Sequence, residues 1–213
     1  MATGVSIKFD FGKLDDFAER LGSISQDQLG QIVVSGLNKV LESAFDLAQS
    51  RMLATINLDP AYVNRKMEKV EATRERPVAE IVAPFGSKAD LTTLSHYGAM
   101  LTTTATAHPD SAGRPDWAIP PGQKQGHPSV EVQRGDRKQM QSSKAFIIPK
   151  LKDNQGNPLI FKRKASGSLA VVYGPSVYQL FGVTAGDIEV EVSDDLADKI
   201  LAMAGDAVER ALT

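Results

Sequence analysis

The residue types that most often carry catalysis or metal binding are scarce in this 213-residue chain, which has three histidines and no cysteine. The absence of cysteine excludes disulfide scaffolds, iron–sulfur sites, cysteine-type zinc sites and thiol nucleophiles. His96, His108 and His127 lie 12 and 19 residues apart, a spacing that matches no common metal-ligand motif. The sequence therefore predicts no metal site and no cofactor.

Asp194 and Asp195 are adjacent carboxylates, and a pair of carboxylates can perform general acid–base catalysis. These two directly precede a predicted helix, however, where the positive end of the helix dipole stabilises negative charge. The chain also lacks a G-x-S-x-G nucleophile elbow, a Walker-type phosphate loop and a G-x-G-x-x-G motif. These observations together predict a protein that is not an enzyme.

Apolar periodicity predicts a long helix near the N-terminus and a second helix at the C-terminus. Apolar residues three and four positions apart run from Leu29 to Met52 and predict a helix over about 25–54. A similar stripe, for which Ser193 or Asp194 can be the N-cap, predicts a C-terminal helix over about 195–212.

Between these helices the sequence predicts one short helix and several strands. Asp59 is a suitable N-cap and Pro60 suits the first helical position, so a charged helix is expected over about 61–70. Alternating or short apolar runs predict strands at 78–82, 130–132, 146–151, 159–163 and 169–173. The turn signal at 154–158 predicts a hairpin. This order predicts an α+β fold with a mixed, mainly antiparallel sheet.

We expect a single domain over 1–213 that contains a long loop or arm at about 98–128. This segment has five prolines and four glycines, which disfavour both helix and packed sheet. Trp117, the only tryptophan, lies in its middle beside Ile119. Tryptophan is a frequent anchor in protein interfaces, so we treat both residues as candidate partner contacts; packing into their own domain is the equally weighted alternative.

The formal net charge of −2 excludes a uniformly basic nucleic-acid binder, but the charges are unevenly distributed along the chain. The segment 134–164 contains nine basic and two acidic residues, a net charge of +7. The segment 187–213 contains eight acidic and two basic residues, a net charge of −6. The basic candidates are Arg134, Arg137, Lys138, Lys150, Lys152, Lys162, Arg163 and Lys164. The acidic candidates are Asp194, Asp195 and Asp198.

Three interpretations of these charge blocks remain open. The basic segment of one copy can meet the acidic segment of the next copy, or it can line a lumen and contact DNA. Alternatively, the two blocks neutralise each other within one chain and are otherwise solvated. No apolar run approaches the length of a membrane span and the N-terminus has no secretory signal pattern, so no membrane contact is expected.

Three blocks of the sequence carry a family resemblance. They are GLNKVLESAFDLAQSRM at 36–52, VNRKMEKVEATRERPVAEIVA at 63–83 and AFIIPKLKDNQGNPLIFKRKASGSLAVVYGPSVYQLF at 145–181. In order and spacing they resemble the minor tail protein Z family of tailed phages and prophages, whose members are tail completion proteins. The resemblance covers roughly two-thirds of the chain, and the segment at 98–128 departs from it as an insertion.

The resemblance implies a structural virion protein, assembled in the host cytoplasm, at the head-proximal end of a phage tail. Such a protein completes the tail and helps to join it to the head. The resemblance also implies a homo-oligomeric ring of six copies, in contact with tail terminator or tail tube proteins, head-side connector proteins and the tape measure protein. A ring agrees with the separated charge blocks, since a heterologous interface pairs two different patches of each copy. A connector protein that contacts DNA through the basic 134–164 segment is the alternative function.

Overall fold

The computed structural model describes residues 3–10, 26–85, 91–104, 124–140 and 145–192, together with residue 202. These residues form helices and antiparallel strands, which confirms the α+β class. The mainly antiparallel pairing is also confirmed, and the described strands form three separate three-stranded sheets in which all pairs are antiparallel. None of the described helices is both long enough and apolar enough to cross a membrane.

The chain divides into two compact units, whereas the sequence predicts a single domain. Unit 1 comprises Met1–Met52, Asn64–Gly86 and Tyr178–Thr213, and unit 2 comprises Leu53–Val63 and Ser87–Val177. Each unit is assembled from separate stretches of chain, so no simple linker marks the boundary between them. Sequence composition therefore gives little indication that the chain divides into two units.

Helix α2 (Gln26–Thr55) provides much of the core of unit 1 and confirms the predicted long helix. The apolar stripe of α2 is buried, because residues three and four positions apart share one face of a helix. Its fully buried members include Val33, Leu37, Val40, Leu41, Ala44 and Ala48. The periodicity therefore predicts both the helix and the face that it buries.

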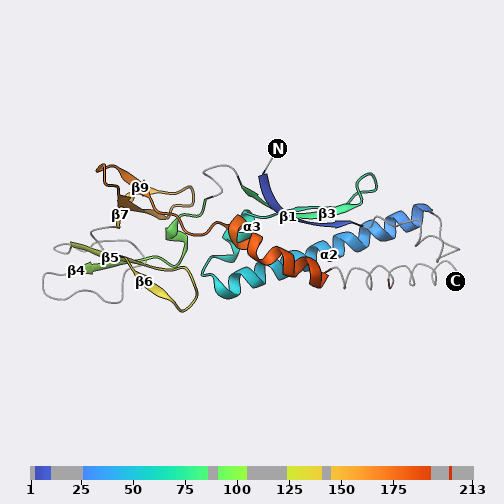
Figure 1. The fold of residues 1–213 in the computed structure, drawn as a ribbon, viewed down its shortest axis with the longest axis horizontal. Helices are drawn as coiled ribbons and strands as arrows, with labels where there is room; N and C mark the ends of the chain where they lie inside the picture. Colours follow the sequence, from blue (N-terminus) through green and yellow to red (C-terminus); the bar gives the residue numbers. More distant parts are fainter. Residues whose placement is uncertain are drawn as a thin grey trace. The chain divides into compact units, whose positions relative to one another are not determined.

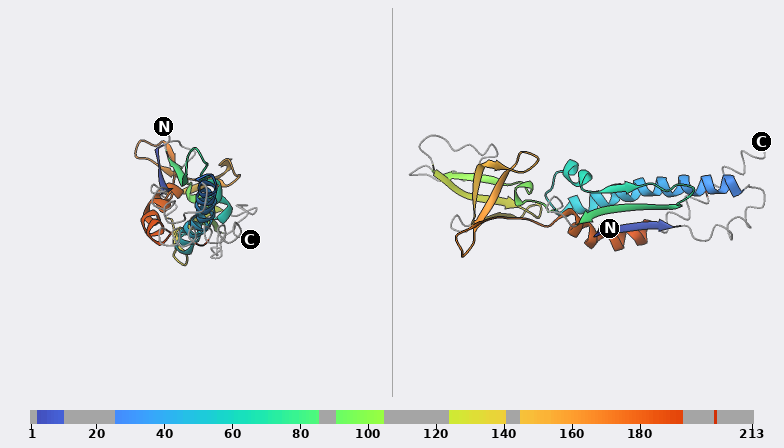
Figure 2. Two further views of the ribbon diagram at one scale, coloured as in Figure 1. Left: turned by 90° about the vertical axis from the view of Figure 1, so that its right-hand side faces the viewer. Right: turned by 90° about the horizontal axis from the view of Figure 1, so that it is seen from above.

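The sheet of unit 1 has the order β1–β3–β2, from β1 (Thr3–Asp10), β3 (Val78–Phe85) and β2 (Glu68–Val70). Alternate residues of β3 are fully buried, namely Ala79, Ile81 and Ala83. Strand β3 confirms the strand predicted at 78–82, whereas β1 was not predicted. Figures 1 and 2 show α2 and a second helix running along the length of this sheet.

A second helix, which covers residues 177–192 in its described part, belongs to unit 1 from Tyr178 onward and was missed from the sequence. It appears in orange to red in Figure 1. Its buried residues recur every three or four positions, and they are Val177, Phe181, Ala185, Ile188 and Val192. Gly182 and Gly186 together with β-branched residues give this segment a low intrinsic helix propensity, which burial of the apolar face overrides. The helix predicted over 195–212 lies outside the described residues, apart from residue 202.

Helix α3 (Pro60–Arg65) begins as predicted, with Pro60 as its first residue. The Asp59 Oδ1 atom accepts a hydrogen bond of 2.7 Å from the backbone N–H of Ala61, which is the expected N-cap. The predicted extension to residue 70 is wrong, because β2 (Glu68–Val70) pairs with β3 instead. The ladder of hydrogen bonds to β3 outweighs the local helical preference.

Unit 2 contains two further sheets, β4–β5–β6 and β7–β8–β9, visible in Figures 1 and 2. The first comprises β4 (Met100–Thr104), β5 (Lys124–Glu131) and β6 (Arg137–Gln139). The second comprises β7 (Phe146–Lys152), β8 (Pro158–Arg163) and β9 (Leu169–Val171). A short 3₁₀ helix, η2 (Leu94–His96), contacts β8. The second sheet confirms the predicted hairpin and the strand that follows it.

The loop predicted at about 98–128 is wrong at both of its ends. Met100 pairs with Ser129 and Leu101 with Pro128 in the β4–β5 ladder. Leu101 is fully buried, and burial of such apolar residues outweighs the turn preference of the surrounding glycines and prolines. A register shift after Leu101 adapts the ladder to this irregular sequence. Residues 105–123, which include Trp117 and Ile119, lie outside the described part of the chain.

Candidate functional site

The basic residues predicted as a site all lie in unit 2, and two of the arginines there hold their own chain together. The Arg134 Nε atom donates a hydrogen bond of 2.6 Å to the carbonyl oxygen of Leu53. Arg137 donates at 2.8 Å to the carbonyl oxygen of Gly98 and forms an ion pair of 3.1 Å with Glu131. Arg134 and Arg137 thus each bond to their own chain, and both residues are exposed.

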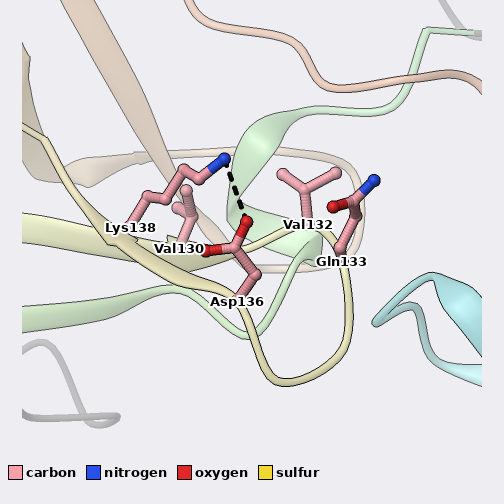
Figure 3. Close-up of a pocket in the computed structure, with 5 residues that line it drawn as sticks. All are labelled: Val130, Val132, Gln133, Asp136 and Lys138. Atoms are coloured by element: carbon pink, nitrogen blue, oxygen red, sulfur yellow. Dashed lines mark ion pairs between the residues drawn. The ribbon is translucent and has the colours of Figure 1, made fainter.

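Lys138 lies at a hollow of about 280 Å³ on the β5–β6 hairpin. Figure 3 shows its lining residues, which are Val130, Val132, Gln133, Asp136 and Lys138. Lys138 forms an ion pair of 2.9 Å with Asp136. The volume is at the small end of the range for ligand sites, and the two charged side chains face one another. This geometry supports a solvated surface depression in preference to a small-molecule site.

The remaining basic residues lie at opposite ends of the β7–β8 hairpin. Ile148 pairs with Leu159, so Lys150 and Lys152 lie towards the turn, whereas Lys162 lies towards the other end of the sheet. Lys152 pairs with Pro158, so Lys152 and Lys162 are separated by roughly 14 Å along the strand direction, at about 3.4 Å per residue. The basic residues of the hairpin thus form two separate groups of exposed cations.

The group at the far end of the hairpin, here called the basic corner, comprises Lys162, Arg163, Lys164 and Leu169. All four residues are exposed, and Leu169 lies opposite Arg163 in the β8–β9 ladder. The Arg163 guanidinium carbon lies 5.9 Å from the centre of the Phe146 ring, in a cation–π contact. Within the described residues, no acidic side chain forms an ion pair with Lys162 or Lys164. The basic corner therefore presents exposed positive charge on both faces of the sheet, since Arg163 shares a face with Leu169 and Lys162 projects from the opposite face.

The acidic candidates Asp194, Asp195 and Asp198 lie outside the described residues. The continuous described part of the acidic block is 187–192, the end of helix 177–192, with Asp187, Glu189 and Glu191. Glu191 forms an ion pair with Arg51 of α2, so it contributes to packing within unit 1. Asp187 and Glu189 are exposed on the surface of the helix.

The structure reveals one polar cluster that sequence reasoning missed. His96 Nε2 and Asp153 Oδ2 are 2.9 Å apart, and their side chains are only 9% and 12% exposed. The Tyr62 ring lies 4.1 Å from the His96 ring, between centroids. Asp153 Oδ1 also accepts backbone N–H bonds within the β7–β8 turn, including one of 2.9 Å from Asn157. His96 and Asp153 are far apart in the sequence, so no local motif could have signalled their contact.

Ser95, the serine next to His96 in the chain, is paired with a threonine hydroxyl. An activated serine requires a hydrogen bond to the base, whereas the Ser95 hydroxyl is 2.9 Å from the Thr93 hydroxyl. The His96–Asp153 pair ties the β7–β8 turn to η2. Among the residues that the structure describes, no three metal-binding side chains gather into a possible ion site.

Comparison of the chain with protein family models, curated proteins and solved structures finds no match. The class of the protein therefore rests on the fold and the candidate site described above. It is an α+β protein with two compact units and exposed charged surfaces on its described elements.

Proposed function

We propose that this protein is a structural component of a tailed-phage virion that completes the head-proximal end of the tail and helps to join it to the head. The observation that carries the proposal is the pair of exposed, oppositely charged surfaces: the basic corner in unit 2 and the acidic helix 177–192 in unit 1. Two different complementary patches on one chain allow a heterologous interface, which closes into a ring when the rotation divides the circle. The resemblance to the minor tail protein Z family supports the same function.

In this proposal the long N-terminal helix, the C-terminal helix and the sheets form the body of a ring of six copies. The hairpin and the arm around Trp117 and Ile119 provide contacts. The neighbours of the ring are tail terminator or tail tube proteins, head-side connector proteins and the tape measure protein. The protein acts through contact and not as an enzyme.

We expect the purified full-length chain to form a closed oligomer, of six copies if it follows the symmetry of the tail. Light scattering and native mass spectrometry over a range of concentrations measure the number of copies. Electron microscopy of labelled virions locates the protein, with the tail neck as the expected position. A chain that stays monomeric at every concentration and never joins tails contradicts the proposal.

A second candidate function is contact with DNA through the basic corner, which is favoured by the lack of acidic partners for Lys162 and Lys164 among the described residues. If the corner binds DNA, changing Lys162, Arg163 and Lys164 to glutamine lowers the salt slope of duplex binding by about 2.7, at about 0.9 for each phosphate contact. The matched control is Lys150→Gln/Lys152→Gln at the other end of the hairpin. Equal binding by the wild type and the triple variant would rule out this function.

A further inference from the structure

We draw no further inference here: the strongest candidate, the partly exposed apolar face of the β7–β8–β9 sheet in unit 2 on which Phe146, Phe161, Val171 and Leu169 lie, carries none, because nothing in the structure shows what covers it.

Discussion

Replacing Phe181 by alanine is expected to lower the free energy of unfolding by about 3–5 kcal/mol, the usual cost of removing a buried phenylalanine side chain. Phe181 is fully buried and lies in the middle of the inward stripe of helix 177–192. The loss combines the transfer free energy of the ring with the cavity that it leaves. Denaturant unfolding followed by far-UV circular dichroism measures the change.

The matched control for this variant is Val183→Ala, two residues further along the same helix. Val183 is 82% exposed, so its truncation is expected to change stability by less than about 0.5 kcal/mol. The contrast between the two positions tests which face of the helix packs inward. Equally small effects at both positions would contradict the packing described for unit 1.

Replacing Gly174 by alanine is expected to destabilise the protein by about 1–3 kcal/mol through overpacking. An alanine Cβ atom at this position would lie 2.9 Å from Cδ2 of Tyr97 and closer still to Cε2. Neither the Tyr97 ring nor the backbone at Gly174 can easily move away. Tyr97 is fully buried and its hydroxyl donates a hydrogen bond to the carbonyl oxygen of Pro175, while the Gly174 backbone N–H bonds to the Thr92 carbonyl oxygen at 3.0 Å.

The protonation state of the Tyr97 hydroxyl helps to hold the Tyr97 ring next to Gly174. Burial, with a smaller contribution from the neighbouring Tyr62, raises the pKa of the Tyr97 hydroxyl well above its usual range. The hydroxyl therefore stays protonated at neutral pH and remains a hydrogen-bond donor. The ring is held in place by this bond and by its burial, so it has little freedom to make room for a methyl group.

Gly30→Ala in helix α2 is the matched control for the Gly174 variant, because no atom lies within 4 Å of the added Cβ. It is expected to stabilise the protein by up to about 1 kcal/mol through the higher helix propensity of alanine. Thermal unfolding of both variants measures whether Gly174→Ala lowers stability while Gly30→Ala raises it. A Gly174→Ala variant as stable as the wild type would contradict the close packing against Tyr97.

The elements that could be predicted from the sequence are those with strong local signals. Helix α2 follows from a long apolar stripe, the start of α3 from Asp59 and Pro60, and the β7–β8 hairpin from its turn residues. In each of these, periodicity, capping or turn chemistry acts over a few neighbouring residues. Tertiary structure confirms these local preferences without reversing them.

The elements that could not be predicted depend on contacts with distant parts of the chain. Helix 177–192 has weak helix formers but a well-buried face, and β2 replaces part of a predicted helix because β3 offers a pairing partner. The His96–Asp153 pair joins residues from separate elements. Helix propensities differ by less than about 1 kcal/mol per residue for most residue types. The free energy gained from burial and strand pairing therefore readily outweighs them.

The sequence by itself determined the α+β class, the long helix, the hairpin and the uneven distribution of charge along the chain. Only the tertiary structure decided which charges are available to a partner. Strand register separates Lys150 and Lys152 from the basic corner, and Arg134 and Arg137 each donate a hydrogen bond to a carbonyl group of their own chain. Charge is a property of each residue type, whereas exposure and pairing depend on residues that are distant in the sequence.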